Sequence, residues 1–175
     1  MLRKIIVLLI VIFTGNTTIC PDAMGWQEMK LIAEHVKVDF SLFPTTNVWE
    51  KKICSPVLDS PNKRNYRTII TNASKNEPNF DGKYRIVEFG MGSGIQYFFI
   101  IDLNTGNVYE GKFSSSGITY SLNSSLIIIN PVENMIWEDN DAVPLWSHIE
   151  YIKWNGQEFV GLLVINWFIQ DDEWR

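Results

Sequence analysis

The sequence predicts an α+β protein in which N-terminal helices pack on an antiparallel β-meander of about six to seven strands. Apolar residues recur at helical spacing before residue 75. Short runs of β-branched and aromatic residues fill most of the chain after residue 83, and glycine- or asparagine-containing turns separate them. A length of 175 residues with 46% hydrophobic residues fits one globular domain with a substantial core.

Residues 1–23 have the composition of a secretory signal peptide. Arg3 and Lys4 form a positive start, Ile5 to Phe13 are all apolar, and small and polar residues follow. Nine apolar residues at about 1.5 Å each are too short to cross a hydrocarbon core of about 30 Å. We therefore expect residues 24–175 to form a single domain in the periplasm or outside the cell, with no membrane span in the mature chain.

The state of the two cysteines depends on the position of signal cleavage. If Cys20 is removed, Cys54 remains alone, and we expect a buried, inert thiol or a reactive one. If Cys20 is retained, a disulfide with Cys54 would tie the new N-terminus to the body of the protein. The sequence leaves these alternatives open.

Two helices and a connector are predicted before the sheet. Residues 24–36 carry an apolar stripe at three- and four-residue spacing, which indicates an amphipathic helix. Residues 36–43 alternate apolar and polar side chains, which predicts a short strand, and residues 45–60 form a connector. Ser60 and Pro61 provide an N-cap and a first-turn proline for a second helix, which Asn76 to Pro78 ends.

The strands follow in hairpin order. In residues 84–89 both faces carry apolar side chains, which predicts a central strand. Gly90 to Gly94 forms a bend, and because a strand follows it rather than a helix, we expect no phosphate site there. Asn104 to Gly106 and Asn155-Gly156 are hairpin turns. Further strands are expected at residues 95–103, 107–110, 118–122, 125–129, 149–154 and 159–168.

Composition and motifs narrow the possible functions. The net charge of −5 disfavours nucleic acid as a partner, since an acidic surface repels phosphate. No catalytic serine elbow, metal-binding histidine pair or paired-cysteine motif is present, so we expect neither a cofactor nor a metal. The acidic loop at residues 133–144 lacks the glycine and the closing glutamate of a calcium loop. The strand carboxylates that could converge for acid–base chemistry are Glu88, Asp102, Glu110 and Glu150.

Several motifs together resemble a family of small exported bacterial proteins. The similarity covers roughly residues 60 to 160 and implies export and a β-rich fold. Family members usually have cysteines in the glycine bend, where this chain has Met91 and Ile95. The resemblance therefore implies no disulfide or metal role for this bend. The matching residues are Asn79, Phe80, Gly82, Lys83, Tyr84, Gly90, Gly92, Ile101, Asp102, Thr105, Gly106, Val108, Tyr109, Ser125, Leu126, Asn130, Pro131, Tyr151, Trp154, Gly156 and Phe159.

These observations favour a protein-binding module of the cell envelope, of the inhibitor or toxin-immunity type, whose partner is another protein. Exposed aromatic side chains anchor many interfaces, so an acidic loop between two tryptophans is the expected contact surface. The alternative is that both tryptophans belong to the core. Two other functions remain open: an envelope hydrolase that uses strand carboxylates, and an accessory subunit of an envelope assembly. The expected contact residues are Trp137, Glu138, Asp139, Asp141 and Trp146.

Overall fold

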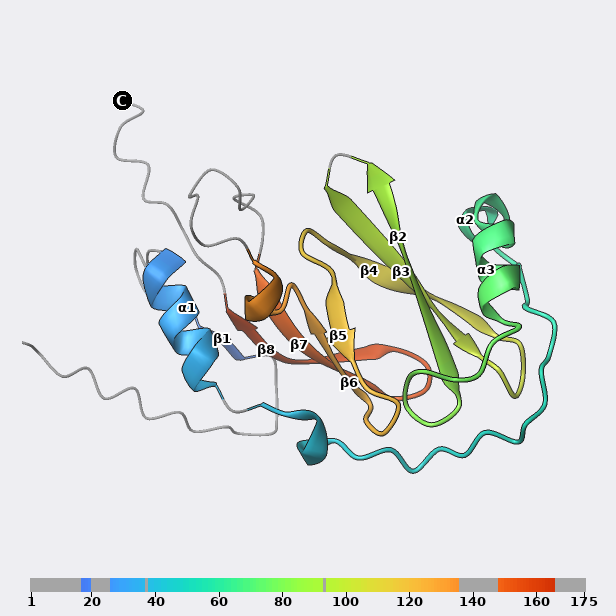
Figure 1. The fold of residues 1–175 in the computed structure, drawn as a ribbon, viewed down its shortest axis with the longest axis horizontal. Coiled ribbons are helices and arrows are strands. Elements are labelled where there is room, and N and C mark those ends of the chain that lie inside the picture. The colour runs from blue at the N-terminus through green and yellow to red at the C-terminus, as the bar shows by residue number, and fades with distance from the viewer. Residues whose placement is uncertain (1–16, 20–25, 37, 93, 136–147, 166–175) are drawn as a thin grey trace, which may run out of the picture.

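The computed structural model describes residues 17–19, 26–36, 38–92, 94–135 and 148–165. Two sheets lie in the middle of the molecule, with α1 on one side and α2 and α3 on the other (Figure 1). The α+β class is confirmed. The antiparallel strands, however, form two sheets rather than one meander, in the orders β2-β3-β4 and β8-β7-β6-β5, and β1 adds to β8 in parallel. The helices are α1 (Trp26–His35), α2 (Pro61–Asn65), α3 (Arg67–Ala73) and the short 3-10 helices η1 (Phe40–Leu42) and η2 (Val132–Asn134); the strands are β1 (Thr17–Ile19), β2 (Tyr84–Gly92), β3 (Ile95–Asp102), β4 (Val108–Ser114), β5 (Ile118–Tyr120), β6 (Leu126–Ile129), β7 (Ile149–Trp154) and β8 (Phe159–Ile165).

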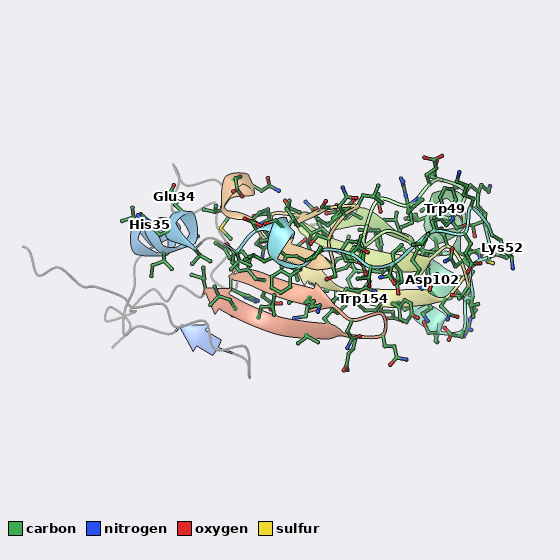
Figure 2. All side chains as sticks on the ribbon, turned by 90° about the horizontal axis from the view of Figure 1, so that it is seen from below. Glu34, His35, Trp49, Lys52, Asp102 and Trp154 are labelled. Carbon is green, nitrogen blue, oxygen red and sulfur yellow. The ribbon has the colours of Figure 1, made fainter. Side chains whose placement is uncertain are left out.

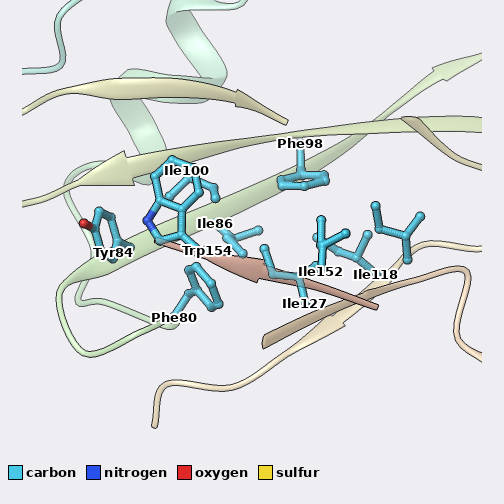
Figure 3. Close-up of a cluster of buried hydrophobic side chains, with 10 residues drawn as sticks. Phe80, Tyr84, Ile86, Phe98, Ile100, Ile118, Ile127, Ile152 and Trp154 are labelled. Atoms are coloured by element: carbon cyan, nitrogen blue, oxygen red, sulfur yellow. The ribbon is translucent and has the colours of Figure 1, made fainter. Parts of the chain in front are cut away.

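The largest apolar cluster fills the space between the two sheets (Figure 3). Trp154 on β7 lies at one end of this cluster, with its ring centroid 5.9 Å from that of Tyr84 and 4.9 Å from that of Tyr109. Alternation along the strands supplies the remaining residues, since every second side chain faces the opposite sheet. These inward-facing strand residues are Ile86, Phe98, Ile100, Ile118, Ile127, Ile129 and Ile152, and Phe80, which precedes β2, packs with them.

Helices α2 and α3 cover the outer face of the three-stranded sheet. Ile70 of α3 is fully buried and packs with Phe99 and Ile101. Ser60 caps α2 as predicted, because its hydroxyl accepts a hydrogen bond from the Lys63 N–H at 3.2 Å.

A third cluster joins α1 and η1 to the outer face of the five-stranded sheet, with Ala33, Phe43, Tyr151 and Leu163 among its buried members. The connector that begins after η1 then runs along one side of the molecule from α1 to α2 (Figure 1). Cys54 lies in this connector, half-buried and free, and its thiol donates to the Asn104 carbonyl oxygen at 3.0 Å. Cys20 lies outside the described residues.

Three local predictions are wrong. The single helix predicted after Ser60 is divided in two, because the chain leaves helical geometry at Tyr66, which ends α2 and precedes α3. The described residues of the 36–43 segment form no strand, because the Asp39 side chain accepts a hydrogen bond from the Ser41 N–H and caps η1. β2 is an edge strand, not a central one. Both of its faces are nevertheless apolar, because α3 covers one and the second sheet covers the other.

Gly106 offers a test of how the connector is held against the β3–β4 turn. Its φ is +81°, and a Cβ atom there would lie 2.2 Å from the Ser55 carbonyl oxygen. Gly94 is a matched control, since its φ is +74° and a Cβ atom there would meet nothing within 4 Å. Left-handed backbone alone costs an alanine roughly 1–2 kcal/mol. Gly106→Ala should therefore lower the free energy of unfolding by about 2 kcal/mol more than Gly94→Ala in urea titrations. Equal losses would show that the connector does not press on this turn.

Candidate functional site: the open end of the two sheets

The four strand carboxylates that sequence analysis singled out do not converge. Asp102 accepts hydrogen bonds from Lys83 Nζ and from the Asn104 N–H, both at 2.9 Å, and so fastens the start of the β3–β4 turn. It lies toward the end of the molecule that carries Trp49 and Lys52 (Figure 2). Asp102 therefore serves a structural role.

Glu110 also serves the structure. It faces outward on β4, where it accepts hydrogen bonds from Asn62 Nδ2 at 2.9 Å and from the Ser60 hydroxyl at 2.8 Å. These hydrogen bonds from Asn62 and Ser60 lower the pKa of the Glu110 carboxyl. Glu110 thus ties the start of α2 to the sheet.

Glu88 and Glu150 face inward, at the end of the inter-sheet space near the glycine bend. We call this the open end and define it by the bend at 90–94 and the turn at 115–117. Glu88 Oε2 accepts a hydrogen bond from the Ile118 N–H at 3.2 Å. A Cβ atom added to Gly117 would lie 3.4 Å from Gln96 Oε1 and 3.7 Å from Glu88 Oε2, so these side chains gather around the turn.

Glu150 is held by two basic side chains. Lys112 Nζ lies 2.5 Å from Glu150 Oε2, and His148 Nε2 lies 2.6 Å from Glu150 Oε1. Lys112 belongs to β4 and Glu150 to β7, so their ion pair joins the two sheets. The Glu150 side chain is 14% exposed, which reduces screening of the pair by water.

The two environments shift the carboxyl pKa values in opposite directions. Burial alone would raise the pKa of Glu150, but the hydrogen bonds from His148 and Lys112 and their charges hold it at about 2. Burial raises the pKa of Glu88, and the hydrogen bond from the Ile118 N–H opposes this only partly. Ile118, Ile129 and Glu150 are partners across adjacent strands, so Glu150 is two strand spacings, about 10 Å, from Ile118.

An apolar surface borders the open end on the outer face of the three-stranded sheet. Phe89, Tyr97 and Phe113 lie side by side across the three strands, with ring centroids 5.9 Å and 5.0 Å apart for successive pairs. We call these three residues the aromatic ledge. Phe113 is 59% exposed, and Met91 at the bend is 46% exposed.

One β-bulge on β4 places Lys112 beside Glu150 and also exposes Phe113 on the aromatic ledge. The β3–β4 register shifts between Tyr97 and Phe99, so that Gly111 and Lys112 together face one residue of β3. The shift reverses the alternation and points Lys112 inward and Phe113 outward. A Cβ atom at Gly111 would lie 2.3 Å from the Phe98 carbonyl oxygen, so the close approach of the two strands depends on glycine here.

The predicted contact residues Trp137, Glu138, Asp139, Asp141 and Trp146 lie outside the described residues. The described residues around that segment adjoin the open end. Asn134 Nδ2 donates to the Ser116 carbonyl oxygen at 3.0 Å, and His148 contacts Glu150. Sequence reasoning missed Lys112 and Phe113, because a bulge leaves no clear mark in one sequence. It also missed His148, which lies just before β7.

The Glu150 cluster predicts a specific dependence of stability on pH. Its folded-state pKa of about 2 lies below the ordinary value of 4.5, so its contribution is complete above about pH 5 and is lost as the pH falls toward 2. Glu150→Gln should therefore be less stable than the wild type at pH 7 by up to about 3 kcal/mol. The difference should vanish near pH 2 in urea or thermal unfolding.

Glu88→Gln is the matched variant and has the opposite sign. The folded state binds the Glu88 proton more tightly than the unfolded chain, so ionisation of Glu88 costs stability as the pH rises above 4.5. Glu88→Gln should be more stable than the wild type at pH 8 and equal to it at pH 3. If both variants shift stability in the same direction at every pH, the two environments are not as described.

No family model, curated protein or solved structure matches the chain. Across the described part of the chain, no group of three or more histidine, cysteine, aspartate or glutamate side chains is arranged to hold a metal ion. Within the same residues, no helix has both the length and the apolar character needed to cross a membrane.

Proposed function

We propose that the chain is an exported protein-binding module of the cell envelope, of the inhibitor or toxin-immunity type, and that it contacts its partner with the open end. The pattern of residues 1–23 supports export. The contact surface consists of Phe113 of the aromatic ledge, Met91 and the polar side chains at the mouth of the inter-sheet space, and the buried Tyr97 supports Phe113 from below. The described helices pack on the outer faces of the two sheets.

The exposure of Phe113 carries the proposal. An aromatic side chain that is 59% exposed and packed on a second ring is costly to hydrate and gains stability when a partner covers it. Contiguous apolar surface next to polar side chains is typical of protein interfaces. β4, which carries Phe113, is an edge strand of its sheet, so no further described strand lies beside it.

The geometry favours binding over catalysis. Both Glu150 oxygens are engaged, by Lys112 and by His148, and the oxygen Oε2 of Glu88 accepts a backbone hydrogen bond. Such groups hold a fixed pattern of charge without presenting an activated nucleophile. A partner that meets this pattern gains specificity from charge and affinity from the ledge.

Site-specific photo-crosslinking in the native envelope tests the proposal. A photoreactive side chain replaces Phe113 in one variant and Val160 in the control; Val160 is 42% exposed on β8, away from the ledge. Position 113 should give one adduct of defined mass, and position 160 should not. Excess wild-type protein should compete the adduct away, whereas Phe113→Asp should compete at least about 10-fold less well. Equal adducts at both positions, or none at 113, would refute the proposed surface.

A second function, an envelope hydrolase, is favoured by one observation. Glu88 and Glu150 lie at the same end of the sheets with pKa values shifted in opposite directions, as in acid–base pairs. Purified protein should then release soluble fragments from cell-wall material, and Glu88→Gln should lower the rate at least about 100-fold. Glu77→Gln is the control, since Glu77 is exposed and lies before β2, outside the strands that carry Glu88 and Glu150. Wild-type protein without turnover would exclude this function.

A further inference from the structure

The connector before α2 holds three exposed aliphatic side chains around the β3–β4 turn. Val48 is 76% exposed, Ile53 is 52% exposed and Val57 is 43% exposed. Hydrogen bonds fasten the backbone at or next to each of them to residues 103–106 of the turn. These bonds run from Asn104 Nδ2 to the Val48 carbonyl oxygen at 3.0 Å, from the Cys54 N–H to the Leu103 carbonyl oxygen at 3.3 Å, and from the Val57 N–H to the Gly106 carbonyl oxygen at 2.8 Å.

Two lysine side chains lie in the same connector. Lys51 and Lys52 are exposed, and within the described part of the chain neither ammonium group takes part in an ion pair. Trp49 Nε1 donates to the Lys52 carbonyl oxygen at 3.2 Å, and its indole packs against the apolar cluster beneath α3. The backbone that carries both lysines is therefore held in place. Glu50 is the one acidic residue between positions 45 and 58.

Charge is divided unevenly along the chain. Residues 44–78 contain six lysine and arginine residues and three aspartate and glutamate residues, a net charge of +3 in a chain whose net charge is −5. Arg64 Nη1 donates to the carbonyl oxygens of Leu58 and Asp59 at 3.3 Å and 3.1 Å, so a further cation lies at the end of the connector. Figure 2 shows Trp49 and Lys52 at the end of the molecule opposite α1.

We propose that the connector binds the surface of an anionic phospholipid bilayer. The binding surface, which we call the connector patch, consists of Val48, Lys51, Lys52, Ile53 and Val57. Its aliphatic side chains enter the headgroup layer, and its ammonium groups contact lipid phosphates. Each lysine close to an anionic bilayer adds to the binding free energy, and so does the apolar area that leaves water.

The composition of the connector patch favours a lipid surface over a protein partner. Protein interfaces are enriched in aromatic residues and arginine and are depleted in lysine. Trp49 is the one aromatic residue between positions 45 and 58, and its ring packs against the protein's own core. Lysine next to aliphatic side chains is instead typical of segments that lie on membranes.

The acidic remainder of the protein does not prevent this contact. β3 runs from Ile95 at the glycine bend to Asp102 at the β3–β4 turn, and its eight residues span about 25 Å. Physiological salt screens charge over about 8 Å, so the carboxylates of the open end are too distant to repel the bilayer. Asp102, which lies at the connector end, is paired with Lys83. A bound protein would therefore turn its open end away from the membrane.

Vesicles of two compositions test the lipid class. The protein is purified after export and mixed with vesicles of phosphatidylcholine alone or with one third phosphatidylglycerol, and binding is measured by sedimentation. Anionic vesicles should bind it saturably at about 0.1 M salt and release most of it at about 0.5 M. Neutral vesicles should bind it at least about 10-fold more weakly. Intact mass shows whether residues 1–23 have been removed; if they remain, the apolar residues 5–13 add the same background to every variant.

Variants then locate the surface. Lys51 has φ +56°, a left-handed conformation that asparagine tolerates. Lys51→Asn should therefore keep or raise the thermal midpoint, weaken binding to anionic vesicles about 5-fold and reduce its dependence on salt. Ile53→Ser should weaken binding about 3- to 10-fold without changing the salt dependence. Leu42→Ser is the matched control, since Leu42 is 56% exposed but lies on η1, and its binding should equal that of the wild type.

Four outcomes would overturn the proposal. The first is no binding of the folded protein to anionic vesicles at low salt. The second is equal binding to neutral vesicles, which would indicate apolar adsorption without charge recognition. The third is wild-type affinity in both Lys51→Asn and Ile53→Ser, which would place the contact elsewhere. The fourth is self-association in place of vesicle binding, measured by ultracentrifugation, which would make a second copy the occupant. None of these results depends on whether position 113 crosslinks to a partner.

Discussion

Apolar packing between the two sheets is the constraint on which the rest of the structure depends. The indole of Trp154 contacts rings from both sheets, among them Tyr109 at 4.9 Å and Phe159 at 5.1 Å between centroids. Full burial of one large apolar side chain is worth roughly 2–3 kcal/mol, so ten buried residues in this cluster dominate the association of the sheets. Where the apolar residues stop, Glu88, Lys112 and Glu150 occupy the next inward positions. At the open end, charged side chains therefore occupy the inward positions that apolar side chains fill elsewhere between the sheets.

Asparagine side chains hold the turns at both ends of the molecule. Asn130 is buried with φ +51°, accepts hydrogen bonds from the N–H groups of Ser115 and Ser116, and donates to the His148 carbonyl oxygen. One side chain thus fixes the 115–117 turn relative to the start of β7 and keeps His148 beside Glu150. Asn104 plays the same part at the far end, where it bonds the backbone of Val48 and Glu50.

Local signals in the sequence predicted most of the helices, strands and turns, but they did not predict how the strands assemble into sheets. Asn155 accepts hydrogen bonds from the N–H groups of Gln157 and Glu158, and Gly156 has φ +99°, as the hairpin prediction requires. Strand alternation also placed Glu88 on the face of Tyr84 and Ile86. The division into two sheets could not be predicted, because every antiparallel pair joins consecutive strands and the sheets separate only where β4 and β5 do not pair, which no local signal marks. The short alternation at residues 36–43 misled because a single capping side chain, Asp39, outweighed it.

The bulge at Gly111 explains why the candidate site escaped sequence reasoning. Strict alternation from Tyr109 would place Lys112 outward and Phe113 inward, and would give a solvated lysine and a core phenylalanine. The extra residue reverses both. It therefore removes an apolar residue from the inter-sheet space, supplies the cation that Glu150 requires, and exposes the ring that completes the aromatic ledge. A glycine that lets β4 approach the Phe98 carbonyl oxygen is the one local requirement for all three effects. Two of these effects, the loss of an apolar residue from the inter-sheet space and the exposure of Phe113, cost stability that a regular strand would retain, whereas the Lys112–Glu150 ion pair stabilises the fold.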